Sequence, residues 1–271
     1  MKALRIDDFE RTSFEYGSKE RLVFRHGSGP AVLVMAEMPG ITPNVLRFAG
    51  RVADIGCTAV LPHLFGVPGR DVGGNTLLAG LYVNQAFFPA CVSKEFTLWA
   101  TNRTSPVVEW LRALAAHEHE RCGGPGVGAV GMCFTGGYAL AMATHSAVVA
   151  PVLSQPSMPL NLTKRRRRSI DCSPEDVAVV RQRCAGEGLR VMGLRFKGDR
   201  YVPDSRFAFL RDQLGDAFVA VELDDSAANP DAVMRNPHSV LTEHLVDVPG
   251  TPTRNALEQV LSLFRNKLLT D

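Results

Sequence analysis

The chain has 271 residues, of which 45% are hydrophobic and 21% are charged. A chain of this length can bury one large core without metals or disulfides to hold it together, so we expect a single domain over residues 1–271. A formal net charge of only +2 gives no strong attraction to nucleic acid or to an anionic membrane, and leaves small molecules as the expected partners.

The ends and the cysteines of the chain favour a cytoplasmic protein. Residues 1–8 lack the apolar stretch of a secretion signal, and no segment approaches the roughly 20 apolar residues of a membrane span. The cysteines are irregularly spaced, which indicates neither a metal site nor a disulfide framework. We therefore expect a soluble protein that is not exported. The six cysteines are Cys57, Cys91, Cys122, Cys133, Cys172 and Cys184.

Short β-rich runs alternate with longer helical patterns along the chain. This alternation predicts an α/β fold, three layers deep, with a mostly parallel central sheet and helices on both faces. The run Ala31–Ala36 is apolar throughout, as expected of a central strand covered on both sides. The predicted strands lie near residues 20–26, 30–37, 57–62, 127–132, 147–154, 190–196 and 217–223.

Four predicted helices begin at a Ser or Thr followed by Pro. The hydroxyl residue caps the first turn, and the proline presets the backbone of the helix. The helices that follow carry apolar residues at amphipathic spacing, so each has a face for the sheet. The four pairs are Thr42-Pro43, Ser105-Pro106, Ser173-Pro174 and Thr251-Pro252.

Two stretches, residues 66–95 and 155–172, break this pattern and are predicted to be loops over the core. The second contains the basic run Lys164–Arg168. Such a run resembles a nucleic-acid patch, but the balanced net charge favours a solvated loop. Both stretches are candidates for covering an active site and setting its specificity.

Cys133 stands between a predicted strand that ends at Met132 and a predicted helix that begins at Thr135. A nucleophile at such an elbow sits on a tight turn with small neighbours, where the helix dipole favours a thiolate. The usual pattern, G-x-nucleophile-x-G, departs here at Thr135, followed by Gly136 and Gly137. The competing interpretation is an inert buried thiol. No G-x-S-x-G occurs to offer a serine instead.

A hydrolase with this elbow needs an acid and then a histidine, in that chain order, from loops after later strands. Asp199 follows the strand near 190–196, and His238 follows the strand near 217–223. Asp204 is a rival acid that resembles a helix cap, and His244 is a rival base in a segment that could be helical. Order and placement favour Asp199 and His238.

Together these motifs resemble the dienelactone hydrolase family over most of the chain from about residue 30. The similar segments, besides the cysteine elbow, are Ala36–Gly40 with its glutamate, Phe96–Trp99, the Gly-Asp-x-x-Val-Pro loop at 198–203, and the pair His238-Ser239. Residues 155–189 match poorly and are predicted to be an insertion or a remodelled loop.

The resemblance implies Cys133 as nucleophile, His238 as general base and acid, and Asp199 as the residue that orients it. It also implies an oxyanion hole made of the backbone N–H groups of Phe134 and Met38.

Glu37 ends an apolar strand, where a lone carboxylate is costly to bury without a role. The resemblance implies that Glu37 hydrogen-bonds the resting thiol and takes part in its activation. The alternative is a salt-bridged residue at the end of a strand.

Substrate contacts are less well defined. Trp99 is a candidate contact through the resemblance. Members of the family that cleave dienelactone hold the substrate carboxylate with two arginines, and the corresponding places resemble Val92 and Thr242 here. Arg103 or Arg200 could supply a replacement guanidinium, although surface arginines are common.

The sequence therefore predicts hydrolysis of a small-molecule ester or lactone through a Cys-His-Asp triad and a thioester acyl-enzyme, without cofactor or metal. An alternative is a non-hydrolytic protein of the same fold that uses Cys133 as a redox-sensing or ligand-binding thiol. A glutamine amidotransferase-like protein is a third possibility, opposed by the later Asp199 and His238 loops. We expect a monomer or homodimer that binds neither nucleic acid nor membrane.

Overall fold

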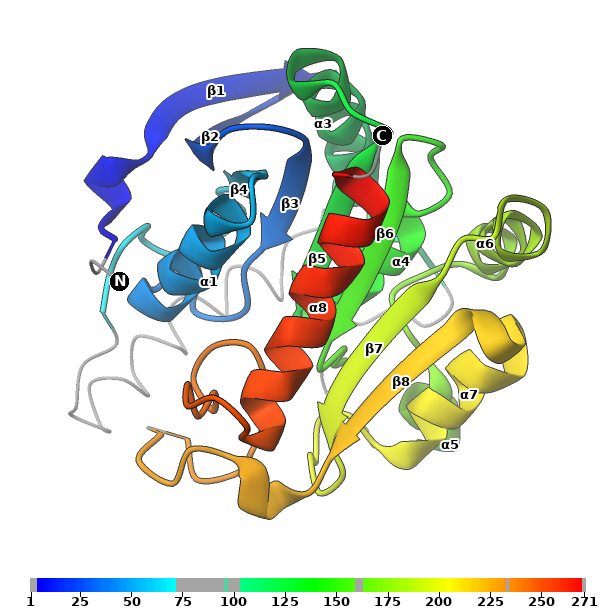
Figure 1. Cartoon of the computed structure of the whole chain (residues 1–271). Helices are drawn as coiled ribbons and strands as arrows, with labels where there is room; N and C mark the ends of the chain where they lie inside the picture. The colour runs from blue at the N-terminus through cyan, green and yellow to red at the C-terminus, as the bar shows by residue number, and fades with distance from the viewer. Residues whose placement is uncertain (1–3, 72–95, 97–102, 159–162, 233, 270–271) are drawn as a thin grey trace.

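The fold is an eight-stranded, mostly parallel sheet covered by helices on both faces (Figure 1), as seen in a computed structural model. The structure describes residues 4–71, 96, 103–158, 163–232 and 234–269. The strand order is β1-β2-β4-β3-β5-β6-β7-β8. The strands are β1 (Glu10–Tyr16), β2 (Lys19–Gly27), β3 (Ala31–Met35), β4 (Thr58–Pro62), β5 (Val127–Met132), β6 (Val148–Ser154), β7 (Val191–Phe196) and β8 (Phe218–Leu223).

Strands β4, β3, β5, β6, β7 and β8 run parallel, whereas β1 and β2 add an antiparallel edge. The carboxyl ends of parallel strands meet at one edge of a sheet, which is where ligands bind in open α/β folds. In the register of β3 and β5, Met35 lies opposite Gly131. The segments that follow these two strands, which carry Glu37 and Cys133, therefore start side by side.

The helices form two layers, each with its own apolar core. Helices α1 and α8 pack against one face of the sheet, and α3, α4, α6 and α7 against the other (Figure 1). Within the described ranges, no helix has both the length and the apolar composition to cross a bilayer. The helices are α1 (Pro43–Asp54), α3 (Val107–Cys122), α4 (Gly136–Met142), α5 (Lys164–Arg168), α6 (Pro174–Glu187), α7 (Asp204–Leu214) and α8 (Pro252–Leu268).

All seven predicted strands are present, and the sequence analysis missed only β1 among the strands of the described residues. The sequence of β1, Glu-Arg-Thr-Ser-Phe-Glu-Tyr, gives a weak apolar signal because it is an edge strand with mostly exposed side chains. Its antiparallel pairing with β2 spans the whole strand, from Glu10 opposite Arg25 to Tyr16 opposite Lys19.

The four Ser/Thr-Pro pairs all lie at helix starts, but only two of the hydroxyls form caps. Thr42 accepts from the amide of Val45 at 3.4 Å, and Ser173 accepts from Asp176 at 3.1 Å. The Ser105 and Thr251 hydroxyls bond elsewhere, and neither caps its helix. Their side chains instead tie the helix start to neighbouring loops.

The predicted loops are only partly described. Residues 72–95 lie outside the described ranges. Residues 155–172 are not loop throughout, because the basic run forms the short helix α5, which Thr163 caps by accepting from the amide of Arg166 at 3.2 Å. Helix α6 then fills most of the rest of the predicted insertion, 155–189.

Candidate active site

Cys133 lies on a sharp turn between β5 and α4. Its φ angle is +57°, in the left-handed region that a residue with a side chain enters only at a cost. Gly131 is required here, since a Cβ at that position would lie 2.0 Å from the carbonyl oxygen of Thr135. The turn leaves the Cys133 side chain half-buried at the carboxyl edge of the sheet.

Thr135 occupies the place of the second glycine of the elbow pattern without distorting the turn. Its buried hydroxyl accepts from the amide of Met132 at 2.8 Å and lies 3.0 Å from the carbonyl oxygen of Met35. The hydroxyl also lies 2.8 Å from the carbonyl oxygen of Met132, so its one proton is shared between the elbow itself and the end of β3. The departure from the pattern is compensated by a polar side chain that bonds inward.

The glycines after Thr135 supply the close packing. A Cβ on Gly136 would lie 2.7 Å from the Cα of Pro156, and one on Gly137 would lie 2.8 Å from the amide nitrogen of Asp171. Because neither position carries a side chain, α4 can pack closely against the 155–172 segment. In this chain, the close packing that requires glycine therefore occurs at Gly136 and Gly137, directly after the position of the second glycine in the usual elbow pattern.

His238 and Asp199 form a buried hydrogen bond next to this elbow. The Nδ1 of His238 lies 2.7 Å from Oδ2 of Asp199, and both side chains are almost fully buried. The other carboxylate oxygen of Asp199 accepts from the amide of Tyr201 at 2.9 Å. The Tyr201 ring stands edge-on to the imidazole, with 5.3 Å between the ring centroids. These contacts fix the orientation of the imidazole.

Cys133 and Asp199 both act on the pKa of His238. Burial alone would lower this pKa, but the negative charge of Cys133, and hydrogen bonds to Asp199 and Cys133, raise it well above its usual value. The structure thus places the bonded pair of His238 and Asp199 next to the elbow that carries Cys133.

The two rival residues have other partners. Asp204 is exposed at the start of α7 and forms an ion pair with Arg195. His244 lies in a turn rather than a helix, and its Nε2 is 2.9 Å from the carbonyl oxygen of Met234. Its Nδ1 accepts from the amide of Ser239 at 3.2 Å, and burial lowers its pKa, as suits a neutral imidazole. His244 therefore supports the loop that carries His238.

Glu37 is buried at the carboxyl edge, but the hydrogen bond expected between it and the thiol is not formed. Among the described residues, its carboxylate accepts only from the hydroxyls of Ser239 and Thr242 and from the side-chain amide of Gln155, the last at 3.1 Å. Thr242 is the place where the resemblance puts a substrate-binding arginine. Glu37 thus joins the end of β3 to the loop of His238.

Ser157 holds the thiol instead, and the sequence analysis missed it. Its hydroxyl lies 3.0 Å from the Sγ of Cys133, and its amide donates to the carbonyl oxygen of Cys133 at 3.0 Å. Gln155, just before it, has a φ of +35°, the other positive φ at a non-glycine residue in the described chain. The available signal was position alone, because Ser157 follows β6 at the carboxyl edge.

Arg206 is a second residue that sequence reasoning missed. Its fully buried guanidinium donates to carbonyl oxygens on three segments, at 2.6 Å to Ser169, 3.0 Å to Pro156 and 2.7 Å to Tyr201. Burial lowers its pKa to about 10, while the charges of Asp199 and Cys133 oppose the shift, so it stays cationic at neutral pH. Arg206 fixes the backbone on both sides of the thiol and the acid.

The two residues of the expected oxyanion hole follow neighbouring strands. Phe134 comes directly after Cys133 and is buried, and Met38 packs against the same apolar cluster as Cys133. The Thr135 hydroxyl joins the two segments through the Met35 carbonyl. The backbone of both segments therefore lies beside the nucleophile.

The candidate substrate contacts are spread out. Trp99 lies outside the described residues, as does Val92. Arg103 is exposed before α3, and Arg200 is exposed in the loop after Asp199. Within the described ranges, no group of three or more His, Cys, Asp or Glu side chains is arranged to hold a metal ion.

A cysteine on a strand-to-helix elbow, with an acid and a histidine after later strands, places the chain among the α/β hydrolases. The sequence model of the dienelactone hydrolase family matches residues 21–170, more than half of the chain. The chain belongs to this family, which is a family of hydrolases. A search of the curated proteins finds no match.

Solved structures agree on the fold at low identity. A protein from Klebsiella pneumoniae described as a dienelactone hydrolase is 15% identical, with a TM-score of 0.61 over 94% of this chain and 97% of that one. A cold-adapted esterase from an Arctic intertidal metagenomic library is also 15% identical (TM-score 0.55, 99% and 98% covered). A dienelactone hydrolase-like promiscuous phosphotriesterase from metagenomic libraries is 16% identical (TM-score 0.54, 96% and 98% covered).

Proposed function

We propose that this protein hydrolyses a carboxylic ester or lactone with Cys133 as the nucleophile, His238 as the base and Asp199 as the residue that orients it. The observation that carries the proposal is the left-handed Cys133 at the elbow, close to a buried imidazole held at 2.7 Å by Asp199. The family supplies the reaction class, and these side chains supply the chemistry.

In the first half-reaction, the Cys133 thiolate attacks the substrate carbonyl carbon. The amides of Phe134 and Met38 would stabilise the oxyanion of the tetrahedral intermediate. His238, carrying the proton taken from the thiol, passes it to the departing alcohol oxygen as the C–O bond breaks. The products are a thioester on Cys133 and a free alcohol, or the open hydroxyacyl chain of a lactone.

In the second half-reaction, His238 takes a proton from water, and the hydroxide attacks the thioester. Acylation itself prepares His238 for this step: the thioester has no negative charge, so it removes a charge that raises the histidine pKa in the free enzyme. With its pKa lowered, the imidazole is unprotonated at neutral pH and is free to accept a proton from water, and the thiolate leaves as the acid forms. The thiol, the imidazole and one water account for every bond made and broken.

Two further side chains have roles in this proposal. Ser157 would donate its hydroxyl proton to the thiolate at 3.0 Å, which stabilises the attacking form. Glu37 would act as a positioning residue, because its carboxylate holds Ser239 and Thr242 in the loop of His238.

The test is turnover of an activated aryl ester by Cys133→Ala and by Ser157→Ala. We expect Cys133→Ala to lose at least about a thousandfold in kcat/KM with the fold intact, and Ser157→Ala to lose roughly three- to thirtyfold, because one hydrogen bond to a charged sulfur is removed. Mass spectrometry of the quenched wild-type enzyme should find an acyl group on Cys133.

Two results would overturn the proposal. Full activity in Cys133→Ala would show that Cys133 is not the nucleophile. A wild-type protein that reacts with peroxide at Cys133, yet turns over no ester or lactone in a broad panel, would favour the redox-sensing or ligand-binding alternative.

A further inference from the structure

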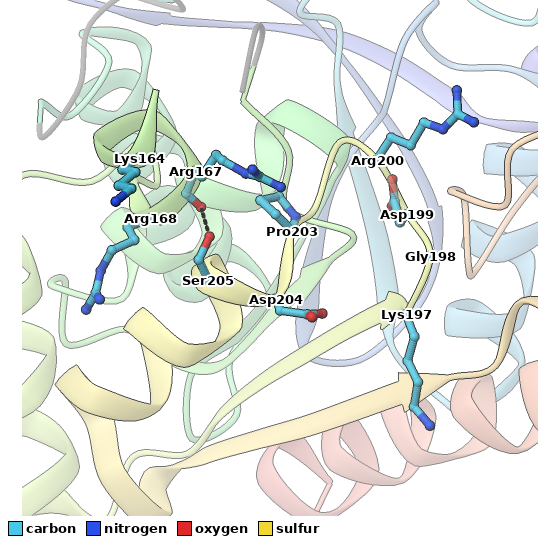
Figure 2. Close-up of a pocket in the computed structure, with 10 residues that line it drawn as sticks. All are labelled: Lys164, Arg167, Arg168, Lys197, Gly198, Asp199, Arg200, Pro203, Asp204 and Ser205. Atoms are coloured by element: carbon cyan, nitrogen blue, oxygen red, sulfur yellow. Dashed lines mark hydrogen bonds between the residues drawn. The ribbon is translucent and has the colours of Figure 1, made fainter. Parts of the chain in front are cut away.

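A hollow of about 560 Å³ lies beside the loop that carries Asp199, between α5 and the start of α7. Figure 2 shows the Arg167 side chain reaching toward Pro203, whereas the charged ends of Arg168, Lys197 and Arg200 point outward in different directions. We call it the basic hollow, because five cationic side chains line it. They are Lys164, Arg167, Arg168, Lys197 and Arg200.

The two acidic residues of the lining do not neutralise this charge. Asp199 is buried and hydrogen-bonded to His238, and Asp204 forms an ion pair with Arg195. Arg195 also pairs with Glu222, so Asp204 keeps part of its charge, but the lining still has five cations against two carboxylates. The hollow therefore keeps an excess of positive charge.

Helix α5 is held in place against the active-site loops. The Arg206 guanidinium donates to the carbonyl oxygen of Arg166 at 3.0 Å, and the Ser205 hydroxyl donates to that of Arg167 at 3.1 Å. The same guanidinium bonds to the Tyr201 carbonyl in the loop of Asp199. The basic side chains thus project from a backbone that is fixed relative to the triad, unlike those of a solvated loop.

Two of the cations have no acid to neutralise them. Arg168 pairs with Asp212 at 2.9 Å, and Lys197 pairs with Asp224 at 3.0 Å. Lys164 and Arg167 form no ion pair within the described part of the chain, and both are exposed at the rim. Their donors are available to a ligand.

We propose that the basic hollow binds a phosphate group, carried either by the ester substrate or by a separate small molecule. A phosphate carries up to two charges and three terminal oxygens that accept, so it can bond to Lys164 and Arg167 and still attract the other cations of the lining. Arginine and lysine are the side chains that bind phosphate most often. A single carboxylate would leave most of these donors unmatched.

Direct binding tests the hollow without any catalysis. We expect inorganic pyrophosphate, titrated into the full chain by calorimetry at low salt, to bind to the wild type. The Lys164→Gln/Arg167→Gln double variant should bind roughly tenfold more weakly, because two cation contacts are lost. The matched control is Arg165→Gln, on the same helix but outside the lining, which should bind as the wild type does. Absent binding, or an equal loss in Arg165→Gln, would overturn the proposal.

A pair of esters separates the two sources of phosphate. These are 4-acetoxyphenyl phosphate and 4-methoxyphenyl acetate, which share the acetyl group. A phosphate on the substrate predicts a higher kcat/KM for the first, with a ratio that falls in the double variant and stays in Arg165→Gln. A separate ligand predicts the same pyrophosphate binding with no preference between the esters.

The kinetic arm rests on the proposed function, whereas the binding arm does not. Cys133→Ala should lose turnover of both esters and still bind pyrophosphate. A wild type that binds pyrophosphate but cleaves neither ester would contradict the hydrolase alone. A wild type that cleaves both esters at equal rates and binds no pyrophosphate would contradict the phosphate site alone.

Discussion

Two buried arginines, at opposite edges of the sheet, each donate to several backbone carbonyl oxygens, but they hold different parts of the fold. At the amino edge, Arg183 donates to carbonyl oxygens of the turn that leads into β6, at 2.6 Å to Ala143 and 2.7 Å to His145. At the carboxyl edge, Arg206 donates to the carbonyls around the active site. A guanidinium with several donors can satisfy many backbone acceptors at once. The role of each arginine therefore depends on the segments whose carbonyls it holds.

The two edges also differ in their acids. Arg183 has an exposed partner, Glu187, at 2.8 Å. At the carboxyl edge, the buried carboxylate of Glu37 is held by side-chain donors instead. The Arg206 guanidinium and the Glu37 carboxylate together fix the loops of this edge, which carry the proposed catalytic residues.

The largest effect is expected from Arg206→Met, which keeps the length of the side chain but removes its donors. Several buried carbonyls lose their partners, so we expect the free energy of unfolding to fall by about 3–5 kcal/mol in urea denaturation. Ester turnover should fall as well, because the segments of Ser157 and Asp199 lose a shared anchor.

The matched control for this comparison is Arg183→Met. It should lose a similar amount of stability, for the same reason, while the folded protein keeps its kcat/KM. If both variants lose turnover to the same extent below their unfolding transitions, the two edges do not differ in the way described.

A smaller effect, on activity, is expected from Glu37→Gln. The Ser239 and Thr242 hydroxyls donate to this carboxylate, and an amide would offer one of them a donor in place of an acceptor. We expect kcat/KM to fall roughly tenfold to a hundredfold, because the loop that carries His238 is no longer held in position. In the same loop, Glu243→Gln should have little effect, since Glu243 bonds to Asn44 instead. A change in stability with unaltered kcat/KM would make Glu37 purely structural.

The smallest effect concerns Asp171, a buried carboxyl group that lies behind α4. Burial raises its pKa to about 7, although hydrogen bonds from Ser105 oppose the shift. The geometry agrees: the single proton of the Ser105 hydroxyl cannot serve both Asp171 and the Phe96 carbonyl, so a protonated Asp171 completes the chain of bonds.

The sign of the pH dependence follows from this shift. The folded pKa lies above the unfolded value, so the contribution of Asp171 to stability is present in acid and is lost as the pH rises from about 4 to 7. Asp171→Asn can donate to Ser105 at any pH. At pH 8 we expect the free energy of unfolding of this variant, measured by urea denaturation, to exceed that of the wild type by about 1–2 kcal/mol. Near pH 5 we expect this difference to disappear. A constant difference across this range would contradict the assignment.

Much of the fold was predictable because its central strands are continuous apolar runs, and β1 was missed because its exposed side chains form no such run. Cys133, Asp199 and His238 could be chosen as candidates from their order along the chain, and the structure places Asp199 against His238. Ser157 was not, because its contact with the thiol depends on the unusual backbone at Gln155, which no local pattern announces. For Glu37 the sequence predicted burial at the site, but its partners lie about 200 positions away along the chain.

Thr135 gives the elbow a mechanical property that glycine would not. Its hydroxyl fastens the nucleophile's turn to the end of β3, the strand whose extension carries Met38, a proposed oxyanion donor. In the proposed mechanism, this contact would couple the position of the attacking sulfur to that of the donor through the sheet, and not through the outer loops.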